Sequence, residues 1–436
     1  MPGPLRSVAV AAALVTGVVV YFGGLLGSQS RDATGTAKSS AAAAASLLNG
    51  FAAGDTDSYI QELEQRVAVT ERRDPKALAL LGLAYLQRVR ETGDVSAYPR
   101  AEESLAEALR LDAKNLYATT GLAALAASRH RFEEARAIAE RAIALSPYAA
   151  APYGILGDAL VETGRYEEAF EAFDRMVALR PSASGYARIS YARELLGDTE
   201  GAVAAMRLAV EATGPAAEPA AWATVHLGNL QLEQGRLARA AKLYRHALAR
   251  LPGYAPAVGG LARVEFLLGH HRAAIGLYRD ALARADLPEF AIWLGDAYAA
   301  LGRTADAEQA WERAVKLEAA FTAYGGRNDL ETALFDLDHD RNLRDALARA
   351  REGQKERPSV EGEHVLAWAL YKNGECRKAR SHSVRALRLG TKDTGAMLHR
   401  SLIERCLGNV DAAVEFRERA LAANPYALVA FGRSGP

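Results

Sequence analysis

Apolar positions along this chain come in pairs of short amphipathic runs, and each run has the spacing of a helix. In one pair the apolar residues are Ile155, Leu156 and Leu160, followed by Tyr166, Ala169, Phe173, Met176 and Val177. Gly164 lies between the two runs, where a glycine can adopt the positive φ of a tight turn without a Cβ clash. Pro181 ends the second run, because proline cannot donate a backbone hydrogen bond. The pattern predicts a helix, a turn and a second helix.

Small residues repeat this unit through most of the chain. An alanine returns every 33 to 39 residues, at Ala135, Ala169, Ala202, Ala240, Ala274, Ala307, Ala346, Ala379 and Ala413. A glycine precedes it by five residues at Gly164, Gly197, Gly235, Gly269, Gly302, Gly374 and Gly408. Such self-similarity indicates stacked helix pairs that bury their apolar faces only against neighbours, so we expect one extended solenoid. Two longer gaps, at residues 213–219 and 319–326, predict a bend or a specialised contact.

The order of residues within a unit resembles the tetratricopeptide repeat. The residues that carry the resemblance are Leu156-Gly157, Gly164, Tyr166, Ala169, Phe173 and Pro181, then Leu227-Gly228, Gly235, Ala240, Tyr244, Ala247 and Pro252, then Leu294-Gly295, Tyr298, Gly302, Ala307, Trp311 and Ala314. The resemblance covers roughly residues 57 to 425. It implies an all-α, right-handed superhelical solenoid of about ten helix-turn-helix repeats. Ala333-Leu334 replaces the Leu-Gly pair in one unit, and Phe416 is one place out of phase, which affects local packing only. The whole chain also resembles membrane-anchored or exported bacterial proteins of this family.

The N-terminus differs from the repeats. Residues 7–28 contain no charged side chain and are long enough to span a bilayer as a hydrophobic helix. Arg6 precedes them, which favours a cytoplasmic N-terminus. A membrane anchor is our first interpretation and a cleaved secretory signal the alternative; either exports the repeats. The expected organisation is 1–6 cytoplasmic, 7–28 anchor or signal, 29–45 flexible tether, 46–426 solenoid and 427–436 C-terminal tail.

Charge and motif content narrow the class of function. The 53 basic and 53 acidic residues are interleaved and give zero formal net charge, so nucleic acid is not expected as a partner. No sequence motif for a phosphate, dinucleotide, zinc or nucleophilic site is present. We therefore expect no enzymatic activity and no small-molecule cofactor.

One acidic cluster suggests a metal site. Asp336, Asp338 and Asp340 alternate like the first ligands of a calcium loop. The loop would need glycine at its sixth position and glutamate at its twelfth, where this chain has Arg341 and Leu347. A solvated turn between two helices is the favoured interpretation, and no metal is predicted. His270-His271 is likewise assigned to a surface turn.

The two cysteines are candidates for a disulfide. Cys376 begins the second helix of one predicted unit, and Cys406 ends the first helix of the next. Because adjacent helices run antiparallel, both ends lie at one edge of the solenoid. A bridge suits an oxidising, exported location, whereas the alternative is two small residues buried separately.

The family resemblance also implies where a partner binds. First helices line a concave groove in tetratricopeptide arrays, and the positions just after the Leu-Gly pair face it. These positions are Asp158, Tyr191, Asn229, Arg263, Asp296, Phe335 and Trp368, with Tyr371 one turn further on. For Phe335 and Trp368, contact with a neighbouring helix is an equal alternative. The Lys, Asn and Arg clamp with which some members bind a peptide carboxylate is incomplete here, so an extended or helical protein segment is the expected partner.

The sequence as a whole predicts a membrane-tethered, extracytoplasmic scaffold that binds another protein. A divalent-metal-dependent or enzymatic module seeded by the 336–340 cluster is one alternative. A soluble secreted repeat protein is the other.

Overall fold

The computed structural model describes residues 55–214 and 217–430, and within these residues it contains helices and no strand. The helices of the first part are α2 Thr56–Val69, α3 Pro75–Thr92, η3 Val95–Ala97, α4 Tyr98–Leu111, α5 Leu116–Ser128, α6 Phe132–Leu145, α7 Ala150–Glu162, α8 Tyr166–Leu179, α9 Ala183–Leu195 and α10 Thr199–Glu211. Those of the second part are α11 Ala217–Glu233, α12 Leu237–Arg250, α13 Ala255–Leu267, α14 His271–Arg284, α15 Pro288–Ala300, α16 Thr304–Ala323, α17 Asp329–Asp338, α18 Leu343–Glu356, α19 Val360–Lys372, α20 Cys376–Ala386, α21 Thr394–Cys406, α22 Val410–Ala423 and α23 Ala427–Ala430.

From α3 to α22 the helices pack as ten successive pairs, each made of neighbours in sequence. The glycine of the Leu-Gly pair allows the two helices of a unit to approach. A Cβ on Gly228 would lie 2.6 Å from the Tyr244 ring, and one on Gly157 would overlap the Phe173 ring. Glycine is therefore required at these positions by the aromatic side chain of the second helix.

Two units carry a serine in place of that glycine and solve the same packing problem differently. Ser190 Oγ donates to the carbonyl of Ala202 at 2.8 Å, and Ser401 Oγ donates to that of Ala413 at 2.6 Å. Both hydroxyls are buried, and the hydrogen bond satisfies them. The predicted alanine ladder thus marks the contact between the two helices of a unit.

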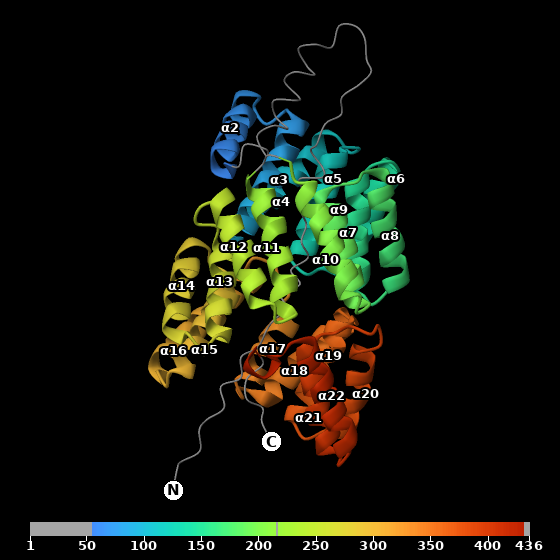
Figure 1. Ribbon diagram of the computed structural model, residues 1–436. Coiled ribbons are helices and arrows are strands. Elements are labelled where there is room, and N and C mark those ends of the chain that lie inside the picture. Colours follow the sequence, from blue (N-terminus) through green and yellow to red (C-terminus); the bar gives the residue numbers. More distant parts are fainter. Residues whose placement is uncertain (1–54, 215–216, 431–436) are drawn as a thin grey trace.

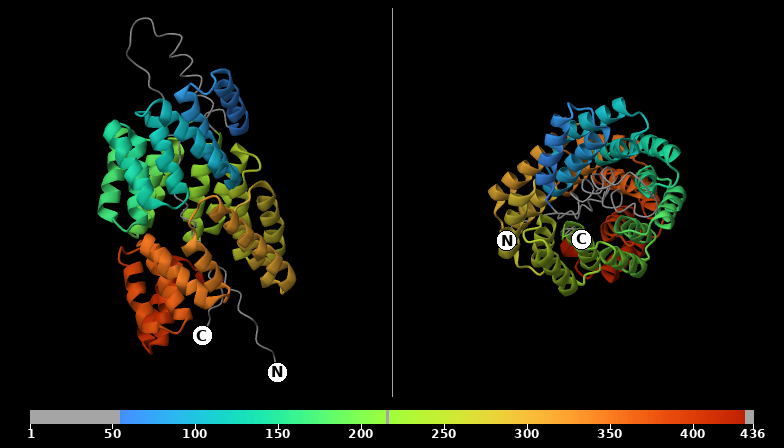
Figure 2. Two further views of the ribbon diagram at one scale, coloured as in Figure 1. Left: turned by 180° about the vertical axis from the view of Figure 1, so that it is seen from behind. Right: turned by 90° about the horizontal axis from the view of Figure 1, so that it is seen from above.

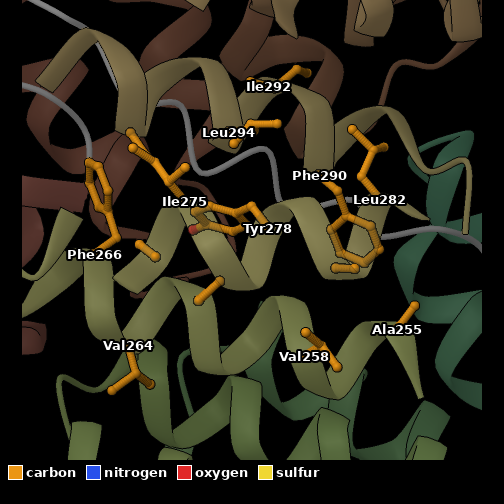
Figure 3. Close-up of a cluster of buried hydrophobic side chains, with 14 of the residues drawn as sticks. Ala255, Val258, Val264, Phe266, Ile275, Tyr278, Leu282, Phe290, Ile292 and Leu294 are labelled. Carbon is orange, nitrogen blue, oxygen red and sulfur yellow. The ribbon is translucent and has the colours of Figure 1, made fainter. Parts of the chain in front are cut away.

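The apolar faces of consecutive units form clusters along the solenoid. Figure 3 shows one of these clusters, in which side chains of α13, α14 and α15 converge. Tyr278 from α14 lies at its centre, and its side chain is 2% exposed. Each helix pair is buried mainly by its neighbours, as repeat architectures require.

The helix pairs wind around a central axis. Seen from above, the chain runs clockwise while it descends from α3 to α22, so the superhelix is right-handed (Figures 1 and 2). The later units, from α17 onward, lie below α5 to α10 in Figure 1. The described chain therefore makes more than one superhelical turn.

Successive superhelical turns contact each other directly through backbone amides. Asp286 N donates to the Thr92 carbonyl at 2.9 Å, and Arg327 N donates to the Arg129 carbonyl at 3.0 Å. Val360 N donates to the Tyr166 hydroxyl at 2.7 Å. The partners are 194 to 198 residues apart, which gives the length of one superhelical turn. We call these contacts between turns the seam.

A buried ion pair lies in the same seam. Arg357 reaches Glu162 at 2.9 Å, and the two side chains are 7% and 4% exposed. Arg357 also pairs with Glu331 at 2.5 Å. Two buried charges are tolerated because they are paired and hydrogen-bonded to each other.

The longer gap predicted at residues 319–326 carries one of the seam contacts. Helix α16 continues to Ala323, and the Gly325 carbonyl then accepts a hydrogen bond from Arg131 Nε at 2.9 Å. Of the two predicted consequences, a specialised contact is the one found here. The other gap includes residues 215–216, which lie outside the described part of the chain.

The end of the chain folds back against the preceding turn. Residues 424–430, here named the C-terminal segment, include the short helix α23. Asn424 Nδ2 donates to the Leu232 carbonyl at 3.4 Å, and Ala427 and Ala430 are buried. The first four residues of the predicted 427–436 tail are therefore helical and packed.

The predicted anchor and tether, residues 7–28 and 29–45, lie outside the described residues. Among the helices that the structure describes, none has the length and apolar run that a membrane span requires.

Candidate binding surface inside the superhelix

Several of the predicted groove positions connect neighbouring units. Asp158 of α7 accepts hydrogen bonds from Arg188 of α9, Nε to Oδ1 at 2.9 Å and Nη2 to Oδ2 at 2.6 Å. Both side chains are buried. Burial raises the pKa of Asp158, although the guanidinium of Arg188 acts in the opposite direction. The carboxylate is thus engaged in joining two units.

Asp296 of α15 is also used internally, but only by one of its oxygens. Its Oδ1 accepts from Trp311 Nε1 at 3.2 Å and contacts His339 Nε2 at 2.9 Å. Burial lowers the pKa of His339, but the hydrogen bond and charge of Asp296 outweigh this and raise it. The second oxygen, Oδ2, is buried and has no hydrogen-bond partner in the described part of the chain.

The two aromatic positions predicted for the groove pack between helices. Phe335 is 7% exposed and belongs to the buried cluster that contains Leu294 of α15 and Trp311 of α16. Trp368 donates from Nε1 to Asp338 Oδ1 at 2.8 Å and stacks on His399 at 3.7 Å. Contact with a neighbouring helix, the alternative interpretation, describes both residues.

The remaining predicted residues are half-buried. Asn229 Oδ1 accepts from Tyr244 Oη at 2.8 Å, and Tyr371 stacks on Trp368 with centroids 5.0 Å apart. Among the described residues, the Tyr191 side chain has no hydrogen bond, and the Arg263 side chain has neither a hydrogen bond nor an ion pair. Arg263 lies over the Trp293 ring at 4.7 Å.

Tyr191 and Arg263 line a cavity of about 620 Å³, here named the main cavity. One wall includes α9, α11 and α13, and the other includes α19, α21, α22 and the C-terminal segment, so the cavity lies between two superhelical turns. Sequence reasoning missed several of its acidic side chains, among them Glu194, Glu233, Glu361 and Asp393, and also His364. Glu194 and Glu233 lie about one helical turn beyond the predicted groove positions, which is the signal that could have found them.

Two carboxyl groups of the cavity, those of Glu194 and Glu233, have raised pKa values. Burial and the nearby charge of Asp393 raise the pKa of Glu194 to about 7. Burial and the charge of Glu194 raise the pKa of Glu233 well above its ordinary value, and Arg263 opposes this. The side chains of Glu194 and Glu233 have no hydrogen-bond partner among the described residues. A cation placed beside these carboxylates would stabilise their charged form.

A second, smaller cavity adjoins the first. Its volume is about 10 Å³, and its wall includes Trp293 and Asp296. Trp293 Nε1 and Asp296 Oδ2 are buried, and neither has a hydrogen-bond partner among the residues that the structure describes. Arg263, Leu267 and Ala430 line both cavities.

The acidic cluster proposed as a metal seed is dispersed over separate partners. Asp336 bonds to Arg349 and accepts from Asn342 at 3.4 Å. Asp338 accepts from Trp368, and Asp340 pairs with Lys372 at 2.5 Å. No group of three potential metal ligands occurs in the described ranges. His270 contacts Glu265 at 2.8 Å.

Cys376 and Cys406 are joined by a disulfide in the structure, with Cα atoms 6.2 Å apart. The bond links the start of α20 to the end of α21, at the edge of the solenoid where both helices approach a turn. It therefore joins the last two units.

Comparisons with known proteins agree with the helix pairs. Models of the tetratricopeptide repeat match residues 131–184, 156–219, 231–291, 288–321 and 364–427, which together span more than half of the chain. A search of curated proteins found no match. Similar solved structures include a monomeric mutant of IFIT1 with Gppp-AAAA, at 15% identity over 83% of this chain and 76% of that chain, with a TM-score of 0.38. Another is the human IFIT1 dimer with PPP-AAAA, at 15% identity over 88% and 80%, with a TM-score of 0.35. The chain belongs to the tetratricopeptide repeat family.

Proposed function

We propose that this protein is a scaffold that holds a segment of another protein inside its superhelix, in the cavity between the two turns. The observation that carries the proposal is a set of half-buried polar side chains that line this cavity and form no hydrogen bond among the described residues. The side chains of Tyr191, Glu194 and Glu233 form no hydrogen bond within residues 55–214 and 217–430, and the Arg263 guanidinium lies over the Trp293 ring without a hydrogen bond or ion pair there.

A contrast between equivalent positions of different units supports this interpretation. Asp158 occupies the same repeat position as Tyr191 and Arg263, but its carboxylate forms an ion pair with Arg188. Leaving polar groups half-buried and unpaired costs free energy, so a protein segment that supplies partners would bind there favourably. An enzymatic or metal-dependent role receives no such support, because Asp336, Asp338 and Asp340 have other partners.

Membrane tethering is part of the proposal and rests on the sequence alone. Residues 7–28 form an uncharged stretch, and residues 29–45 are a polar linker to the repeats. We propose an extracytoplasmic array on a single anchor, with a secreted array after signal cleavage as the alternative. Fractionation of cells and determination of the mature N-terminus distinguish the two, because only the anchored protein keeps residue 7 onward in the membrane.

Site-specific photocrosslinking tests the binding surface. A benzophenone amino acid replaces Tyr191 inside the cavity or, as a matched control, Tyr148, which is 81% exposed in a loop. We expect a discrete crosslinked partner peptide from position 191 and none from position 148. The same products from both positions, or no product from position 191, would contradict the proposal.

A further inference from the structure

We propose that the C-terminal segment is a displaceable cover over a site on α13 and α15 that takes a lysine or arginine side chain from the partner's segment. This inference rests on the proposed function, because it names the chemistry of the segment that the inner surface binds.

The first observation is a pair of unsatisfied atoms under the cover. Asp296 is fully buried and lines the small cavity, and its Oδ2 has no hydrogen-bond partner among the described residues. Trp293 lines the same cavity, and its buried Nε1 also has no partner within residues 55–214 and 217–430. From the C-terminal segment, as far as the structure describes it, Ala430 alone lines this cavity, and a methyl group can neither donate nor accept a hydrogen bond. The site is therefore poorly matched to its present occupant.

The second observation is that Ala430 separates two cavities. It lines the 620 Å³ cavity on one side and the 10 Å³ cavity on the other, together with Arg263 and Leu267. Moving the segment away would join the two spaces into one site. A partner segment could then reach Asp296 from the main cavity.

The charges around this joined site specify the ligand. Glu194, Glu233 and Asp393 line the main cavity, and Asp296 Oδ2 lies at its end. Of the basic side chains that line the cavity, Arg236 pairs with Glu200 at 2.8 Å and Arg419 with Glu415 at 3.6 Å. Arg263 and Lys392 form no ion pair among the described residues, and these two cations are fewer than the carboxylates of Glu194, Glu233, Asp393 and Asp296. A lysine or arginine side chain provides the missing positive charge, while a backbone carbonyl of the same segment accepts from Trp293.

The cover itself is held weakly. The hydrogen bond that Asn424 donates to Leu232 is long at 3.4 Å, and the other hydrogen bonds of Asn424 are made within the segment or to Ala420 of α22. Helix α23 has four residues, and its buried side chains, Ala427 and Ala430, are small, while Tyr426 and Leu428 are only partly buried against neighbouring clusters. The apolar surface exposed when the segment leaves is therefore mainly the covered part of Tyr426 and Leu428.

The test uses the full chain with the cover dislodged. Ala427→Arg places a charge at a fully buried position of the segment, and Val429→Arg is the matched control because Val429 is 43% exposed. The probes are fluorescein-labelled, C-terminally amidated peptides. One has the sequence of residues 424–430, Asn-Pro-Tyr-Ala-Leu-Val-Ala, and two others carry lysine or glutamate in place of the last alanine.

We expect the Ala427→Arg chain to bind the lysine peptide at least ~10-fold more tightly than the glutamate peptide, because only lysine meets the carboxylates. The wild-type and Val429→Arg chains should bind all three peptides weakly. Adding Glu233→Gln to Ala427→Arg should reduce the preference for lysine. Binding of all three peptides with equal affinity would overturn the inference but leave the proposed function standing.

A measurement on the wild-type chain avoids any folding defect of the variant. Excess lysine peptide should increase hydrogen exchange in residues 424–430, since it displaces the cover, and excess glutamate peptide should not. Unchanged exchange with the lysine peptide would overturn the proposed displacement.

Discussion

Two sets of helix turns occupy the same position in the repeat but have different surroundings. Gly164 and Gly302 both have positive φ, +75° and +71°. A Cβ on Gly164 would lie 2.6 Å from the Pro358 carbonyl oxygen of the next superhelical turn, whereas one on Gly302 would meet nothing within 4 Å. Positive φ favours glycine in both turns. In the turn of Gly164, close contact with the seam requires glycine as well.

The division follows position along the chain. Covered turns contain Gly93, Gly164, Gly197 and Gly235, which face Asp286, Pro358, Gly390 and Pro425 respectively. Open turns contain Gly269, Gly302, Gly374 and Gly408. The early units therefore rest on the later ones, and the cavity lies between them. Sequence periodicity describes the units, while tertiary packing distinguishes them.

Breaking the buried ion pair should have the largest effect on the covered side. Glu162→Gln leaves Arg357 with a buried and partly unmatched charge, and we expect a loss of about 3 kcal/mol in the free energy of unfolding. Glu168→Gln is the control, because Glu168 pairs with Arg165 on the solvent-exposed surface, where an ion pair contributes little to stability. Urea unfolding of both variants measures the difference. Equal losses would show that the seam is not closed in solution.

Reduction of the disulfide tests the open turns separately from the covered turns. Cys376 and Cys406 flank the open turns of Gly374 and Gly408, so a covalent bond joins these two units at turns that the seam does not cover. The bond closes a loop of 30 residues, for which chain entropy gives about 3.6 kcal/mol as an upper estimate. Reduction should therefore lower the stability of residues 360–423 selectively, as measured by hydrogen exchange. Two free thiols in the mass spectrum of the unreduced protein would contradict the bridge.

Alanine substitution in an open turn and in a covered turn measures the difference between them in stability. Gly302→Ala should cost about 1 kcal/mol, because an alanine must adopt positive φ. Gly164→Ala carries the same cost and adds the overlap with Pro358, which we expect to raise the total by about 2 kcal/mol. Thermal unfolding of the two variants gives the difference. Identical melting temperatures would mean that neither turn is covered.

The smallest expected effect concerns pH. The pKa of Glu194 is raised to about 7 in the folded chain, so folding favours its protonated form. Its contribution to stability is present below the ordinary carboxyl pKa and is lost as pH rises through 7. Glu194→Gln should therefore reduce the loss of stability between pH 5 and pH 8 by about 1 kcal/mol or less, given solvent screening. An unchanged difference between the two pH values would exclude Glu194 as a source of this dependence.

The fold was predictable from the sequence because each repeat is stabilised locally. The alanine and glycine positions reported the helix pairs, and glycines such as Gly157 are where the second-helix aromatic residue needs them. The seam was not predictable. Its partners are almost 200 residues apart, and they meet only because small rotations between units add up over a full superhelical turn. Arg357 and Tyr166 carry no local signal of a partner in another turn.

The cavity and its lining were predictable only in part. Of the positions that the family register gives, Tyr191 and Arg263 line the cavity, whereas Asp158 and Trp368 are buried contacts between units. Register identifies which side of a helix faces inward but not which side chain finds a partner there. Glu194 and Glu233 were missed because their importance depends on the second superhelical turn that closes the cavity.

Hydrogen exchange of three seam amides tests the central claim most directly. Asp286, Arg327 and Val360 each donate a backbone N–H to an acceptor in the other superhelical turn. If the turns are in contact, these amides should exchange at least ~100-fold more slowly than in an unstructured peptide, and Tyr166→Phe should release Val360 alone. Exchange of all three at the unstructured rate, while the helix interiors stay protected, would show that the superhelix is open and the cavity absent.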